Sequence, residues 1–154
     1  MPLERVRKVI ASYPELKIIL FEESTHTSEL AAQALGVLPA QIAKTLLFTT
    51  DDQAALVVTC GDRRVNTKLL KKVLGVHKVK FADADTVMNL TGFPPGGVSP
   101  LGAIQPIPIY LDKSLYAFDV VYTAAGTANS ALPISPKRLE ELTGARIIDV
   151  CSVG

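Results

Sequence analysis

The segment over residues 92–106 places the strongest limit on how this chain can fold. It reads GFPPGGVSPLGAIQP and holds four prolines and four glycines in fifteen residues. Because proline breaks both helices and central strands, the segment is expected to form a long loop. Long ordered loops in compact domains are often functional, and Gly96-Gly97 would let the backbone approach a ligand closely. A proline-stiffened surface turn without a function fits the same composition.

Helical periodicity and glycine punctuation define the segments on either side of this loop. Four expected helices stop at Gly36, Gly75, Gly92 and Gly144, where the left-handed conformation of glycine can close a helix. Helices are predicted over residues 3–13, 28–35, 66–74, 83–91 and 135–142. Strands are predicted over 17–21, 45–50, 54–60, 78–81, 107–111, 117–123 and 146–150, the second and third of them as a hairpin. This irregular interleaving favours an α+β (mixed α/β) fold in a single domain over residues 1–154.

The composition is that of an ordinary globular chain, with 48% hydrophobic and 20% charged residues. No run approaches the roughly 18–20 apolar residues that span a bilayer. Charges interrupt the first ten residues, so they do not resemble a signal peptide. Cys60 and Cys151 are too few for a disulfide framework, and a reduced, cytoplasmic chain is expected.

Basic residues are concentrated over residues 63–80. Seven of the sixteen lysines and arginines lie there without an acid: Arg63, Arg64, Lys68, Lys71, Lys72, Lys78 and Lys80. Such a patch is typical of salt-sensitive binding to a polyanion. It is equally compatible with a solvated helix face that keeps the chain soluble.

Several common catalytic signatures are absent. The stretch from Gly97 to Leu101 is not a nucleophile elbow, because leucine stands where the second glycine belongs. His26 and His77 are isolated, so no metal site is expected, and no cofactor motif is present. Cys60 has no activating base nearby in sequence and is interpreted as a core residue.

Lys44 is unusual because it lies where the chain enters an apolar strand, in IAKTLLF over residues 42–48. A lysine at such a position usually extends its amine into solvent. It could instead point into a pocket and hold an anionic group.

Two motifs in this order, IAKTLLF at 42–48 and GGVSPLG at 96–102, make the chain resemble the YbaK family of aminoacyl-tRNA editing domains, related to the domain associated with prolyl-tRNA synthetases. The segment AAGTAN at 124–129 also matches. The resemblance implies a barrel-like mixed β-sheet surrounded by helices. It implies a metal-independent hydrolase of mischarged tRNA, typically proline tRNA, in which the tRNA's own 2′-hydroxyl helps to activate water. The implied partners are charged tRNA and, as a candidate, a prolyl-tRNA synthetase, with no membrane and no DNA.

The resemblance also implies roles for individual residues. Catalytic roles fall on Lys44, Gly96 and Gly97. Substrate-binding roles fall on Phe21, His26, Thr45, Val98, Ser99, Pro100, Thr123, Ala125, Gly126 and Asn129. In the basic stretch, contacts with the tRNA are expected from Arg63, Arg64, Lys68, Lys71 and Lys72.

One departure from the family bears on the substrate. Some members carry a serine in the segment that reads Thr123-Ala124-Ala125-Gly126 here, and this chain has alanine in its place. If the preceding strand continues that far, Thr123 should point to the opposite side. The expected substrate is therefore a tRNA with a small non-cognate amino acid, such as alanine or cysteine. A non-catalytic tRNA- or nucleotide-binding module, or a hydrolase of another small ester, are the alternatives.

Overall fold

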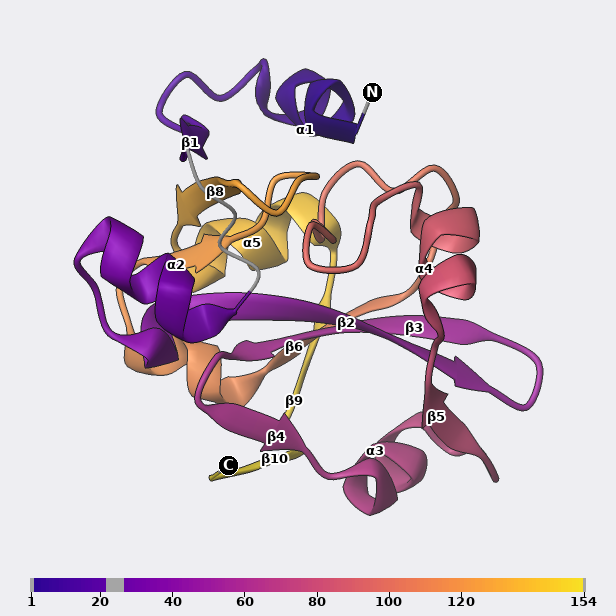
Figure 1. Ribbon diagram of the computed structural model, residues 1–154. Helices are drawn as coiled ribbons and strands as arrows, with labels where there is room; N and C mark the ends of the chain where they lie inside the picture. Colours follow the sequence, from indigo (N-terminus) through magenta and orange to yellow (C-terminus); the bar gives the residue numbers. More distant parts are fainter. Residues whose placement is uncertain (1, 22–26, 154) are drawn as a thin grey trace.

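The computed structural model describes residues 2–21 and 27–153 (Figure 1). Its helices are α1 (Pro2–Ile10), α2 (Ser28–Leu35), α3 (Thr67–Leu74), α4 (Ala84–Thr91) and α5 (Pro136–Thr143), with short 3-10 helices η1 (Pro39–Gln41) and η2 (Lys113–Ala117). The four predicted glycine stops are confirmed, with φ angles of 65–74°. Side chains cap the helix starts, as where the Thr27 hydroxyl accepts the Leu30 N–H. Only α1 ends earlier than predicted, at Ile10.

The strands are β1 (Ile19–Leu20), β2 (Ile42–Thr50), β3 (Ala54–Cys60), β4 (Arg63–Val65), β5 (Val79–Phe81), β6 (Ile109–Asp112), β7 (Val121–Thr123), β8 (Ser130–Ile134), β9 (Arg146–Ile148) and β10 (Cys151–Val153). Eight of them form one mixed sheet in the order β1-β8-β7-β2-β3-β6-β9, with β5 added beside β2. β4 and β10 pair separately. The predicted β2–β3 hairpin is confirmed, with seven paired positions from Ala43↔Cys60 to Thr49↔Ala54.

Some strands differ from the prediction for identifiable reasons. The strand expected over 117–123 begins only at Val121, and Ala117 belongs instead to η2, whose start is capped by the Asp112 carboxylate. β8 was not predicted, and its internal Pro133, which pairs with Tyr122, argues locally against a strand. β4 and β10 were also missed, since each is short and forms only by pairing with the other.

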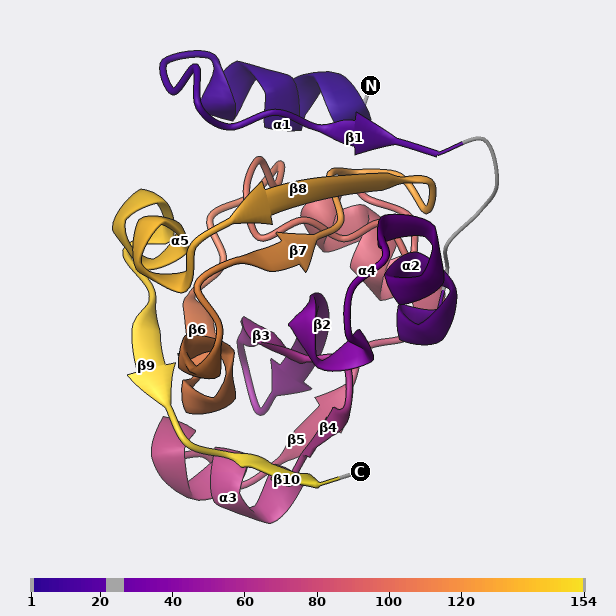
Figure 2. The same ribbon diagram turned by 90° about the vertical axis from the view of Figure 1, so that its left-hand side faces the viewer.

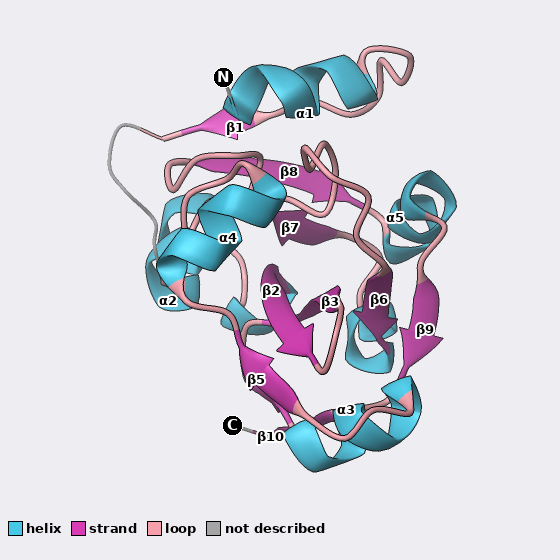
Figure 3. Ribbon diagram, turned by 90° about the vertical axis from the view of Figure 1, so that its right-hand side faces the viewer, coloured by secondary structure: helices cyan, strands magenta, loops and turns pink. Residues whose placement is uncertain are grey.

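The sheet curls around a central core, and the helices cover its outside (Figure 2). α1 lies over one end of the molecule above β8, whereas α3 lies at the opposite end beside β10 (Figures 2 and 3). The predicted α+β class, with a barrel-like mixed sheet surrounded by helices, is confirmed. The strand path is open, because β1 and β9 are its two edges.

Three apolar clusters hold the sheet and helices together. The largest joins α1, α4, α5 and the proline-rich loop to one face of the hairpin, through residues such as Val6, Phe93 and Leu132. A second packs Leu70 of α3 against Phe48 and Val57 on the other face. A third packs α2 against the start of β2. No helix in the described part of the chain is both long enough and apolar enough to cross a membrane.

Candidate functional site

A cavity forms where strand β2 changes its neighbour. One edge of β2 pairs in parallel with β7 through Ile42 and Ala43, and in antiparallel fashion with β5 from Phe48 to Thr50. Between these two partners, no described strand covers Lys44–Leu46 on that edge. A cavity of about 430 Å³ opens there, and its walls come from α2, β2, the loop at 96–98, β7 and the start of β8.

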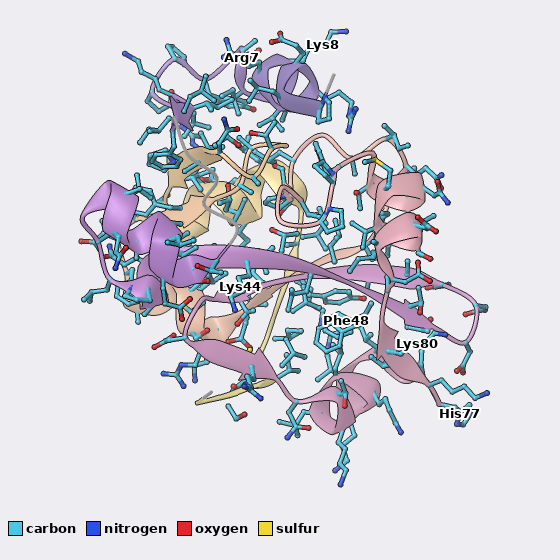
Figure 4. All side chains as sticks on the ribbon, in the orientation of Figure 1. Arg7, Lys8, Lys44, Phe48, His77 and Lys80 are labelled. Carbon is cyan, nitrogen blue, oxygen red and sulfur yellow. The ribbon has the colours of Figure 1, made fainter. Side chains whose placement is uncertain are left out.

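Lys44 lies in this cavity wall together with Gly96 and Val98. The two sequence motifs are about fifty residues apart in the chain, and the fold brings them to one site. Figure 4 shows Lys44 on the half of β2 nearer to α2. Its side chain is exposed and makes no hydrogen bond or ion pair within the described residues. The ammonium group is therefore available to an anionic ligand.

The backbone N–H and C=O of Thr45 lie on the edge of β2 that no described strand covers. The Thr50 N–H donates to Gln53 across the hairpin, so alternate residues of β2 bond to β3 and those between them face the other way. This alternation aims the N–H and C=O of Thr45 at the gap between β7 and β5. The gap therefore offers backbone hydrogen-bonding groups as well as the Lys44 amine.

Only some of the predicted site residues in the proline-rich loop line the cavity. Gly96 and Val98 line it, and their N–H groups donate to no acceptor within the described residues. Gly97 is not among the residues that line it, and its N–H donates to the Pro94 carbonyl at 2.9 Å. The Ser99 hydroxyl is buried and accepts the Leu101 N–H at 3.0 Å. Pro100 lines a different surface hollow.

Gly97 sets the position of this loop, which leads to a stability prediction. A Cβ at this residue would stand 2.9 Å from the backbone of Thr127, closer than real contacts allow. Gly97→Ala should therefore lower the free energy of unfolding by about 1–3 kcal/mol and displace the adjacent Gly96 and Val98. Chemical denaturation measures the first effect. As a control, Gly75→Ala has open space but a φ of 69°, and should cost about 1 kcal/mol. Equal stability of Gly97→Ala and wild type would contradict the close packing.

The turn between β7 and β8 contributes fewer residues than expected. Thr123 and Ala124 line the cavity, since β7 ends at Thr123 and its alternation does not continue. The orientation of Thr123 away from the site was expected only if the strand continued past this residue, and that condition is not met. Ala125 is buried and donates its N–H to the Ser130 hydroxyl. Gly126 instead packs against the backbone of Pro2 at the start of α1.

Phe21 and Asn129 bind each other rather than the cavity wall. The Phe21 N–H donates to the Asn129 carbonyl at 2.8 Å, and the Asn129 amide donates to the Phe21 carbonyl at 3.2 Å. Neither residue is among those lining the cavity in the described structure. The predicted His26 lies outside the described residues.

The basic stretch flanks the site without entering it. Arg63 and Arg64 lie on β4, which begins two residues after Gly61, and Gly61 packs against the cavity residue Ser28. Lys68, Lys71 and Lys72 lie on α3, which packs beneath the far half of β2. Lys80 and His77 lie at that same end (Figure 4). None of the five predicted tRNA-binding residues lines the cavity.

Sequence reasoning missed several residues that shape the site. Ser28 and Glu29 at the start of α2, and Tyr122 on β7, line the cavity. Arg5 of α1 donates to the carbonyls of Gly92 at 2.6 Å and Gly102 at 2.9 Å, and so connects two distant points of the proline-rich loop. The position of Ser28 and Glu29 after a capping threonine gave a local signal, whereas Arg5 gave none.

The two cysteines are not arranged as nucleophiles. Burial raises the pKa of the Cys60 thiol and raises that of Cys151 to about 12. Both thiols are therefore protonated at neutral pH. Within the described residues, no group of three histidine, cysteine or acidic side chains is placed to hold a metal ion.

The sequence and the fold match a known family of proteins. A family model described as the aminoacyl-tRNA editing domain matches residues 22–142, and the chain belongs to that family. The chain is similar to the uncharacterized protein YwhH of Bacillus subtilis (strain 168), with 36% identity over 98% of both chains. It is 36% identical to part of a proline–tRNA ligase of Desulforamulus reducens, over 73% of this chain and 20% of the ligase. A crystal structure of a proposed trans-editing enzyme for prolyl-tRNA synthetase superimposes with a TM-score of 0.92 at 33% identity, covering 98% of this chain and 97% of the other.

Proposed function

We propose that this chain hydrolyses the ester bond of mischarged tRNA in trans, and that its substrate is proline tRNA carrying a small non-cognate amino acid such as alanine or cysteine. The observation that carries the proposal is that an unpaired Lys44 and the N–H groups of Gly96 and Val98, which have no acceptor among the described residues, belong to the lining of one cavity. The editing-domain family and the similarity to a proposed trans-editing enzyme support it.

The cavity offers positioning and polarisation rather than a protein nucleophile. Lys44 is exposed at the mouth, where its ammonium would meet the phosphate or ribose of the tRNA end. The N–H groups of Gly96 and Val98 would donate to the ester carbonyl as negative charge develops on its oxygen. Water, aided by the tRNA's 2′-hydroxyl, attacks the carbonyl carbon. The bond to the ribose 3′-oxygen then breaks, the oxygen takes a proton, and the amino acid leaves as its carboxylate.

A deacylation assay tests this proposal directly. Proline tRNA charged with alanine, cysteine or proline is incubated with the protein, and loss of the labelled amino acid is followed. Alanine and cysteine should be released faster than proline, and a chelator should leave the rates unchanged. Binding of charged tRNA without faster hydrolysis would instead favour a non-catalytic binding module.

The basic stretch should make this activity sensitive to salt. If the α3 lysines contact phosphates, replacing Lys68 and Lys72 together by alanine should reduce the slope of log(kcat/KM) against log salt by about 2. Both side chains are exposed. Replacing the exposed Lys8 and Lys17, which lie near the other end of the molecule, is the matched control and should leave the slope unchanged. Identical slopes for both double variants would show that the α3 lysines do not contact the tRNA.

A further inference from the structure

Phe81 on β5 is the most exposed aromatic side chain among the described residues. It is 57% exposed, whereas Phe48, its direct partner in the ladder between β2 and β5, is fully buried. The two rings contact each other, with their centroids 4.6 Å apart and their planes tilted by 38°. Phe48 therefore holds the Phe81 ring in place from one side and leaves much of its surface open to a flat partner.

The Phe81 ring and the Lys44 amine lie on the same face of the sheet. Residues directly opposite each other in an antiparallel ladder share a face, as Phe48 and Phe81 do. Lys44 shares it too, because it lies four residues before Phe48 in an uninterrupted strand. Figure 4 shows Lys44 and Phe48 one after the other along β2, with Lys80 of β5 beyond them. Lys44 and Phe81 therefore stand at the two ends of the uncovered part of this strand edge.

The separation of these two side chains suits a short stretch of polynucleotide. Four residues of a strand span about 14 Å. A polynucleotide stacked at about 3.4 Å per nucleotide crosses that distance in about four nucleotides, and a stretched one crosses it in fewer. The 3′ end of tRNA is unpaired over its last few nucleotides. With the terminal adenosine at Lys44, an unpaired base shortly before it falls at Phe81.

The chain next to Phe81 is basic. Lys78 and Lys80 precede it and are exposed, and α3, which packs against β5, carries two further exposed lysines. The acid nearest in sequence, Asp83, is held at the start of α4, where its carboxylate accepts the Thr86 N–H. An aromatic ring flanked by cations is typical of sites that bind single-stranded nucleic acid.

We infer that the exposed side of Phe81 stacks on an unpaired base of the tRNA 3′ end, a few nucleotides before the terminal adenosine. This inference rests on the proposed function, because it takes the tRNA end at Lys44 as its fixed point. Stacking on an aromatic ring tolerates every base, so Phe81 contributes affinity rather than sequence selectivity. It also fixes how far the 3′ end reaches, and so places the ester in the cavity.

Binding of uncharged proline tRNA tests this contact without relying on hydrolysis. The tRNA is prepared intact and with a single abasic nucleotide at each unpaired 3′ position in turn. One of these abasic substitutions should weaken binding to the wild-type protein by at least about fivefold, the loss of one stacked base. Phe81→Ala should weaken binding of intact tRNA to the same extent and be insensitive to that abasic substitution. Phe81→Trp, which keeps a stacking ring, should retain the wild-type pattern.

Two further variants separate stacking from general damage. Phe81→Leu keeps an apolar contact with Phe48 and loses the aromatic ring, so it should behave as Phe81→Ala does and covers the case in which the alanine variant does not fold. Tyr116→Ala removes another exposed aromatic side chain, on η2, and should leave binding of every tRNA unchanged.

Several outcomes would overturn the inference. One is wild-type affinity in both Phe81→Ala and Phe81→Leu. Another is an equal loss of affinity for tRNA trimmed of its unpaired 3′ nucleotides, which would mean that the ring acts elsewhere. A lower molecular mass of the free Phe81→Ala protein in solution would show that the ring joins two copies of the chain instead.

The same experiments keep the stacking contact apart from the deacylase function. If the Phe81 variants bind as wild type does and Lys44→Ala is inactive in deacylation, stacking is wrong and the deacylase function stands. If the abasic pattern appears but the wild-type protein hydrolyses no mischarged tRNA, the Phe81 contact stands and the proposed function fails.

Discussion

Lys44→Ala should lose at least about a hundredfold in kcat/KM for deacylation, while its stability stays close to that of wild type. The first effect follows from removing a cation that fixes the substrate in the reaction geometry, where single preorganised groups contribute factors of this size. The second follows from the environment of the side chain, which is exposed and makes no hydrogen bond or ion pair within the described residues. Surface changes of this kind alter stability by no more than about 0.5 kcal/mol.

The matched control for this variant is Lys8→Ala. Lys8 is also an exposed lysine, but it lies on α1, away from the cavity (Figure 4). Single-turnover rates on charged tRNA and thermal melts are measured for both variants. Wild-type rates in the Lys44→Ala variant would show that Lys44 has no role in the reaction, and the proposed function would lose its main support.

Arg5→Met should lower the free energy of unfolding by about 3 kcal/mol, because one guanidinium donates to carbonyls at two distant points of the proline-rich loop. It donates to Gly92 and Gly102 at 2.6 and 2.9 Å, and more weakly to Thr91 at 3.3 Å. Its Cζ also lies 4.7 Å from the centre of the buried Phe93 ring. Methionine keeps much of the apolar length and removes every donor.

This variant should also reduce activity, since the loop that carries Gly96 and Val98 loses the contact that connects two distant points along it. Arg7→Met is the control: Arg7 lies on the same helix, is exposed, and pairs only with Glu4 at 3.7 Å within the described residues. Such an exposed pair contributes at most about 1 kcal/mol. Denaturant unfolding and deacylation rates are compared for both variants. Equal stability of the two would show that Arg5 does not hold the loop.

Local sequence rules predicted most of the elements that position the site. Helix α2 has the bounds expected from its capping threonine and its closing glycine, and the β2–β3 hairpin follows from two apolar runs around a short polar turn. Strands such as β8 were not predictable in the same way. Its only strong local signal, Pro133, opposes a strand, and pairing with β7 decides its conformation.

The sequence by itself determined the helix ends, the hairpin, the irregular loop and the two motifs that mark the family, because each depends on residues a few positions apart. Only the tertiary structure decided which members of each motif meet the cavity. Gly96 and Val98 line the cavity, whereas Gly97 and Ser99 form hydrogen bonds within the loop itself. It also supplies Arg5, whose partner Gly102 is 97 residues away. Contacts over such separations depend on how the sheet and helices pack, and no local pattern encodes them.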